Sequence, residues 1–181
     1  MTEPVPASNW ARNVTFRAKA RHRPGSVREL ADIVAHSNRL RALGTGHSFN
    51  RIADTEGELV SVAGLPRVMR IGPGGSCVTV SAGVTYGALA AFLHSAGLAL
   101  PNLASLPHIS VAGACATGTH GSGVRNGALT TAVAALEFVD ASGALVRLTR
   151  DGDGERFAGA VVALGRLGVV TSMTLDVLPS F

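Results

Sequence analysis

The sequence predicts an α+β domain built from two lobes. The expected elements run strand, helix and several strands in the first half, then helix, loop, helix, hairpin, helix and strand. This order lacks the regular alternation of strand and helix that a doubly wound parallel sheet requires. The 181 residues, 46% of them hydrophobic, suffice for about one domain with a real core. We expect the boundary between the two lobes near residue 83.

The first half combines one helix with several short strands. Ser26 and Glu29 have the spacing of a capping box, and apolar residues at helical intervals follow Ser26. A helix is therefore expected after Ser26. Alternating or continuous apolar runs bounded by glycine and proline predict strands at 14–20, 40–44, 59–62, 68–72 and 77–83.

The second half is richer in helix. Thr85 has the character of an N-cap and Gly97 that of a C-terminal stop, which predicts a helix over about 86–96. A short helix ending in a glycine loop is expected within 110–123. The remaining predictions are a hairpin of strands 132–140 and 144–150, a helix over 154–164 and a last strand over 169–178.

Composition argues against several classes of function. The net charge of +4 and the isoelectric point near 10 come from one lysine and fifteen scattered arginines, so we expect a solvated surface and no nucleic-acid partner. Two cysteines make neither a disulfide framework nor a metal site. The apolar stretches are shorter than the roughly 18 residues of a membrane helix, and the N-terminus resembles no secretory signal. These features predict a cytoplasmic protein without a membrane or metal partner.

A first glycine segment runs from Gly44 to Ser48, with the sequence Gly-Thr-Gly-His-Ser. Its glycines allow a tight turn in which successive N–H groups point toward one anion such as a pyrophosphate. It is neither a complete GxGxxG fingerprint nor a P-loop, which needs Gly-Lys-Ser/Thr. A simple turn between two strands is the alternative.

A second glycine segment runs from Gly113 to Gly123 and contains small side chains, three hydroxyls and a histidine. Small residues permit a flat or extended ligand to approach closely, and Thr117, Thr119 and Ser122 offer hydrogen bonds. Tight helix packing with a C-terminal glycine cap is the alternative. Three hydroxyls within one glycine loop favour contact with a ligand.

Together these segments resemble the alditol oxidases, which include xylitol oxidase. The resemblance rests on GTGHSFN at 44–50, YGALAAFLHSAGLALPNLASLPHISVAGACATGTHGSG at 86–123 and LGRLGVVTSMTLDV at 164–177, in this order. It implies a two-lobed FAD-binding domain of the p-cresol-methylhydroxylase type. On this basis we expect a tail and lead-in at 1–12 and the FAD-binding domain at 13–181, with lobes at about 13–83 and 84–181.

The resemblance also assigns roles to individual residues. It implies that His47 is joined covalently to the 8α-methyl group of FAD, and that Ser105 faces the substrate as a catalytic residue. A larger set is implied to bind the cofactor: Gly44, Thr45, Gly46, His47, Ser48, Ser105, Ser110, Gly113, Thr117, Gly118, Thr119, His120 and Val169 or Val170.

The implied reaction transfers a hydride from a polyol to FAD, which dioxygen then reoxidises with formation of hydrogen peroxide. Alditol oxidases carry a second, substrate-binding domain after this region, and we expect it to be absent from this chain and supplied in cis or in trans. The alternatives are a sugar-lactone oxidase or dehydrogenase of the same family, and a truncated, non-catalytic FAD-binding remnant.

Overall fold

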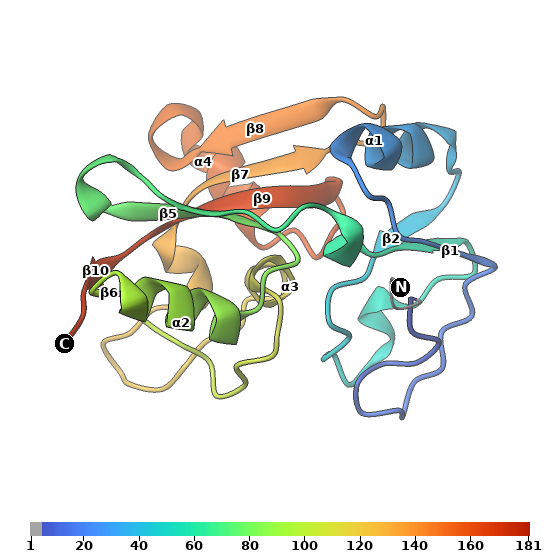
Figure 1. Ribbon diagram of the computed structural model, residues 1–181. Coiled ribbons are helices and arrows are strands. Elements are labelled where there is room, and N and C mark those ends of the chain that lie inside the picture. Colours follow the sequence, from blue (N-terminus) through green and yellow to red (C-terminus); the bar gives the residue numbers. More distant parts are fainter. Residues whose placement is uncertain (1–4) are drawn as a thin grey trace.

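A computed structural model describes residues 5–181 and shows two principal β-sheets (Figure 1). The smaller sheet is parallel and has the strand order β1-β3-β2. It consists of β1 (Ala20–His22), β2 (Leu40–Ala42) and β3 (Glu58–Val60), and helix α1 (Val27–His36) connects β1 to β2. A 3-10 turn, η1 (Arg51–Ala53), precedes β3.

The larger sheet is antiparallel, with the strand order β4-β5-β9-β7-β8. Its strands are β4 (Met69–Ile71), β5 (Cys77–Ser81), β7 (Val133–Val139), β8 (Leu145–Thr149) and β9 (Val169–Asp176). Strand β9 alternates strictly between buried and partly exposed residues, as expected for a strand whose two faces differ.

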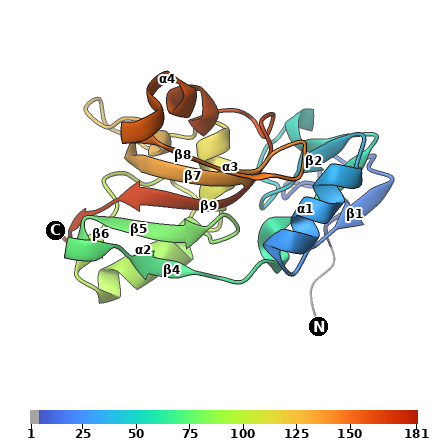
Figure 2. The same ribbon diagram turned by 90° about the horizontal axis from the view of Figure 1, so that it is seen from above.

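Three helices pack around the larger sheet. Figure 1 shows α2 and α3 below it, whereas Figure 2 shows α4 beside β8. Their bounds are α2 (Tyr86–Ser95), α3 (Val111–Ala116) and α4 (Arg150–Val161). The short strands β6 (Leu98–Ala99) and β10 (Leu178–Pro179) pair with each other, and the remaining 3-10 turns are η2 (Val62–Gly64), η3 (Pro73–Gly75) and η4 (Leu129–Ala132).

Two hydrophobic clusters stabilise this arrangement. The larger one joins the antiparallel sheet to the helices and contains fully buried residues such as Val80, Leu89 and Met173. The smaller one, built around Phe16 and Leu59, lies at the three-stranded sheet. The mixture of helices with separate parallel and antiparallel sheets confirms the α+β class.

The predicted caps of α1 and α2 are confirmed, whereas most strands are shorter than predicted by one to a few residues. The Ser26 hydroxyl accepts the N–H of Glu29 at 3.1 Å, and the Glu29 carboxylate accepts the N–H of Gly25 at 2.8 Å. Thr85 caps α2, and Gly97 follows it with a φ of +70°, a conformation that glycine adopts without strain.

Two predicted elements need correction. The predicted strand over 14–20 is not formed, because Thr15 makes only an isolated bridge with Ser8 and β1 begins at Ala20. The alternation in this segment reflects Val14 and Phe16 packing into the smaller cluster. Helix α4 begins at Arg150 rather than 154, because the Thr149 hydroxyl caps it by accepting the N–H of Gly152 at 3.1 Å.

The chain passes from one sheet to the other between Val60 and Met69. This crossing comes earlier than residue 83, where we expected the boundary between lobes, and the division into lobes remains a prediction. No helix formed by residues 5–181 is long and apolar enough to span a bilayer.

Candidate FAD-binding site

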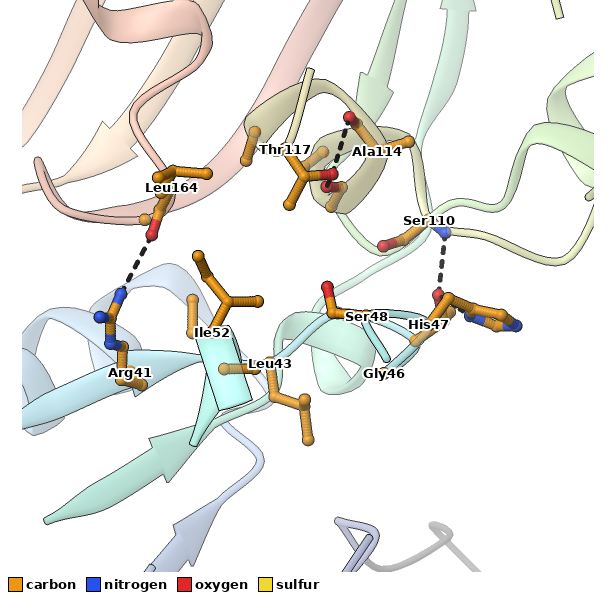
Figure 3. Close-up of a pocket in the computed structure, with 18 of the residues that line it drawn as sticks. Arg41, Leu43, Gly46, His47, Ser48, Ile52, Ser110, Ala114, Thr117 and Leu164 are labelled. Carbon is orange, nitrogen blue, oxygen red and sulfur yellow. Dashed lines mark hydrogen bonds between the residues drawn. The ribbon is translucent and has the colours of Figure 1, made fainter. Parts of the chain in front are cut away.

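A cavity of about 330 Å³ lies where the two sheets meet. Its walls come from the end of β2 and the loop after it, from α3, and from the segment that leads into β9 (Figure 3). A cavity of this size falls in the usual range for small-molecule and cofactor sites, about 300–1,000 Å³. The two glycine segments therefore face one space, although they are far apart in the sequence.

Ser110 joins the two glycine segments. Its backbone N–H donates to the Thr45 hydroxyl at 3.2 Å. A methyl group on either Gly44 or Gly113 would lie only 2.6 Å from the Ser110 Oγ. Both positions thus favour glycine because the loop after β2 and helix α3 approach each other closely.

The first glycine segment is also held by residues near the N-terminus. The Trp10 N–H donates to the Gly46 carbonyl at 2.8 Å, and the Asn9 side chain donates to the Ser48 carbonyl at 2.9 Å. Gly46 has a φ of +72°, so its conformation suits glycine. Asn9 and Trp10 therefore hold this loop in place, although the sequence led us to expect them in a tail and lead-in.

His47 lies in the cavity wall with one nitrogen engaged. Its Nδ1 is 2.9 Å from the Thr45 hydroxyl, whereas its buried Nε2 has no hydrogen-bond partner among the residues that the structure describes. Burial lowers the pKa of His47, and the neighbouring His108 lowers it further. The arrangement favours a neutral imidazole, which has a lone pair available for bonding.

In the second glycine segment, helix α3 ends at Thr117. The Thr117 hydroxyl lies 3.1 Å from the Gly113 carbonyl and 3.2 Å from the Ala114 carbonyl, so it donates within its own helix. Gly118 then turns the chain with a φ of +66°. This helix end therefore fits both interpretations of the second glycine segment. It is a helix C-terminus capped by glycine, and it is also part of the cavity wall.

The structure brings ten of the thirteen predicted cofactor residues together around the cavity: Gly44, Thr45, Gly46, His47, Ser48, Ser110, Gly113, Thr117, Thr119 and Val169. Gly118, Ser105 and His120 do not line it. Ser105 and His120 are exposed, and His120 Nδ1 lies 2.9 Å from the Gly121 carbonyl. The roles of all thirteen remain predictions.

Sequence reasoning missed several residues of the cavity wall. Within residues 5–181, Arg41 is the one charged residue that lines the cavity, and its guanidinium donates to the Leu164 carbonyl at 3.1 Å. Leu164 has a φ of +54°, which is uncommon outside glycine. The position of Arg41 three residues before Gly44 was a usable signal. Leu164 begins the third matching segment, at 164–177, but no place in the cavity wall was predicted for it.

A comparison with known protein families indicates which kind of cofactor this cavity binds. The family described as FAD binding domain matches residues 18–149, which is most of the chain. This chain belongs to the FAD-binding domain family. The match covers the first glycine segment, helices α2 and α3, and the second glycine segment.

Curated relatives of this FAD-binding domain are oxidases and dehydrogenases. The chain is 52% identical to an alditol oxidase of a Streptomyces strain over 178 residues, 96% of this chain and 42% of that protein. It is 38% identical to an L-gulono-1,4-lactone dehydrogenase of Mycobacterium tuberculosis, covering 96% of this chain and 41% of the relative. A bovine L-gulonolactone oxidase is 33% identical over 98% of this chain and 41% of its own length. The chain thus spans about two-fifths of the length of these relatives.

The residues present fit FAD. Because a Cβ atom on Gly44 or Gly113 would lie 2.6 Å from the Ser110 Oγ, both positions favour glycine, and both line the cavity with backbone, as a cradle for a pyrophosphate requires. Arg41 adds a positive charge to the wall of the same cavity. The buried Nε2 of His47 has no hydrogen-bond partner within residues 5–181, so the imidazole has a nitrogen available for bonding.

Proposed function

We propose that this chain is the FAD-binding part of a flavin-dependent alditol oxidase, with FAD attached covalently through His47. The observation that carries the proposal is the half-buried imidazole of His47, which lies in the wall of a cavity formed by both glycine segments and whose buried Nε2 has no hydrogen-bond partner within residues 5–181. The 52% identity to an alditol oxidase supports the same conclusion.

The proposed attachment is an oxidation in which dioxygen is the electron acceptor. The new bond would join an imidazole nitrogen of His47 to the 8α-methyl carbon of FAD. The imidazole nitrogen and the methyl carbon would each lose one hydrogen, and dioxygen would take up both hydrogens and become hydrogen peroxide. A neutral imidazole favours this bond, because a protonated one has no free lone pair. The N–H groups of Gly44, Thr45 and Gly46 would hold the pyrophosphate.

When bound, FAD accepts a hydride from the alcohol carbon and passes two electrons to dioxygen, which becomes hydrogen peroxide. The protein binds and orients the reactants. Ser105 would orient the polyol from its exposed loop. Residues that bind the rest of the substrate would belong to a second domain, in the same polypeptide or in another.

One other function has specific support. Relatives named L-gulono-1,4-lactone dehydrogenase and L-gulonolactone oxidase match almost the whole chain, which supports a sugar-lactone oxidase or dehydrogenase as the alternative.

The test is the visible absorption spectrum of the purified chain before and after acid precipitation, alongside His47→Ala. We expect flavin colour in the wild-type pellet and none in the mutant pellet. His36→Ala, at the exposed end of α1, is the matched control and should keep the colour. Wild-type protein that stays colourless after incubation with FAD would contradict the proposal.

A further inference from the structure

Three aromatic rings stack beside the first glycine segment. The indole of Trp10 lies 5.1 Å from the imidazole of His47, with an angle of 24° between the ring planes. The same indole lies 5.6 Å from the ring of His108 at 29°, and the two imidazoles are 4.7 Å apart. Neither Trp10 nor His108 lines the cavity, so the stack supports His47 from outside the cavity wall.

The backbone fixes Trp10 in this place. The Trp10 N–H donates to Gly46 at 2.8 Å, one residue before His47. The preceding residue, Asn9, is 3% exposed, donates to the Ser48 carbonyl and accepts the N–H of Val14 at 3.0 Å. The indole is therefore anchored to the same loop as the imidazole, on both sides of His47.

Trp10 is the one tryptophan of the chain, and its side chain is 54% exposed, which is unusual for so large an aromatic side chain. It lies outside the hydrophobic core, and its ring stacks on the two imidazoles. Stacked aromatic pairs contribute about 0.5–1.5 kcal/mol beyond the area they bury and prefer defined ring orientations. Such a pair fixes the plane of a ring that has only one hydrogen bond.

We propose that Trp10 is a positioning residue that, with His108, holds the His47 imidazole in the orientation required for covalent attachment of FAD. This inference rests on the proposed attachment at His47. It adds that the N-terminal segment takes part in forming the bond although it does not line the cofactor cavity. His108 is the titratable group that faces His47 in this stack.

The first test uses Trp10 itself, because its fluorescence is the sole tryptophan signal of the chain. A protonated imidazole on the indole face acts as a cation against the ring and quenches the emission. We expect a fluorescence transition with pH that His47→Gln alters and that His36→Gln, the distant control, does not. An unchanged fluorescence transition in His47→Gln would show that the indole of Trp10 does not stack on the imidazole of His47.

The second test compares Trp10→Leu, which keeps an apolar side chain, with Trp10→Phe, which keeps an aromatic ring. Acid-stable flavin is measured over time after FAD is added to each purified chain. We expect Trp10→Leu to slow attachment about tenfold to a hundredfold, as small misplacements of reacting groups do. Trp10→Phe should restore most of the rate.

A purely structural role for Trp10 makes a different prediction. It would lower thermal stability and FAD binding in both variants without separating leucine from phenylalanine. The pKa of His47, followed by NMR of ¹³C-labelled histidine, gives a readout without flavin: removal of the stacked ring in Trp10→Leu should raise it toward its ordinary value.

The outcomes separate the two proposals. Wild-type chain that attaches FAD while Trp10→Leu attaches it at the same rate would overturn the role of Trp10 and leave the proposed function intact. Wild-type chain that binds FAD without acid-stable flavin would overturn the attachment, and the role of Trp10 with it. The fluorescence titration keeps Trp10 in place, so it tests the stacking of Trp10 on His47 even if Trp10→Leu impairs folding.

Discussion

The hydroxyl of Thr45 accepts the backbone N–H of Ser110 at 3.2 Å and joins two segments that are 65 residues apart. It also lies 2.9 Å from Nδ1 of His47. One side chain thus connects the loop after β2, the start of α3 and the proposed attachment site.

Thr45→Val should therefore weaken both the cavity and the attachment. Loss of the acceptor leaves a buried N–H unpaired, which costs about 1–3 kcal/mol in the free energy of unfolding. Urea denaturation measures this loss, and acid-stable flavin measures the attachment. Thr45→Ser keeps the hydroxyl and should retain most of both; equal losses in the serine and valine variants would show that the hydrogen bonds are unimportant.

Arg41 carries the second prediction. Its guanidinium donates to the Leu164 carbonyl, as Figure 3 shows. It is the one charged group among the cavity-lining residues in the described part of the chain. We expect Arg41→Gln to weaken FAD binding by about tenfold, the usual size for a hydrogen bond to a charged group. Riboflavin, which has no phosphate, should bind equally well to both proteins.

Arg39→Gln is the matched control, because Arg39 is exposed and pairs with Glu56 at 3.7 Å rather than lining the cavity. Fluorescence titrations of wild type and both variants, at low and high salt, make the comparison. If Arg41→Gln lost FAD and riboflavin affinity to the same extent, Arg41 would serve only to hold the Leu164 segment.

The sequence predicted the parts of this site that depend on local chemistry. Glycine segments, caps and the hairpin follow from backbone preferences within a few residues, and these elements were found where expected. The contacts of Trp10 with His47 and of Arg41 with Leu164 were missed because they join residues far apart in the sequence. Such contacts follow from the packing of two sheets, which no local pattern encodes. Ser105 shows the reverse case, since it belongs to a recognisable motif but lies outside the cavity wall.

Asp54 makes stability depend on acid pH. Its carboxylate is 1% exposed and pairs with Arg17 at 2.9 Å and Arg51 at 2.8 Å. Burial alone would raise the pKa of Asp54, but the hydrogen bonds from Arg17 and Arg51 outweigh it and lower the pKa to about 2. A lowered pKa means that folding favours the charged form, so this stabilisation is complete above the ordinary pKa and is lost as pH falls through about 2.

Asp54→Asn should accordingly lower the free energy of unfolding by about 2 kcal/mol at pH 7, the amount that corresponds to the pKa shift. The difference from wild type should shrink between pH 4 and pH 2, because wild-type Asp54 then takes up a proton. Denaturation curves at several pH values test this. A difference that stayed constant down to pH 2 would show that charge pairing at Asp54 contributes nothing.

Gly168 should tolerate no side chain. A methyl group there would clash with the Val139 carbonyl, and its φ of +154° disfavours other residues. Because Gly168 lines the cavity directly before β9, we expect Gly168→Ala to destabilise the fold by several kcal/mol and to abolish FAD binding.

Gly159→Ala is the control. Gly159 lies at an exposed position of α4 with free space around it, and alanine there should stabilise the helix by about 0.5–1 kcal/mol. Melting temperatures of the two variants should therefore move in opposite directions.

The two cysteines should differ in reactivity. Burial raises the pKa of the Cys115 thiol to about 11, against a smaller opposing effect of the hydrogen bond with the Tyr86 hydroxyl at 3.5 Å. Since the thiolate is the reactive form, Cys115 should resist iodoacetamide in the folded protein, whereas the partly exposed Cys77 should react. Mass spectrometry of folded and urea-unfolded chain measures the labelling of each. Because Cys115 lies in α3 and within the second glycine segment, bound FAD should slow its labelling further by suppressing local opening. Labelling of Cys115 at the rate of Cys77 in the folded chain would mean that α3 opens readily and does not form a stable wall for the cofactor.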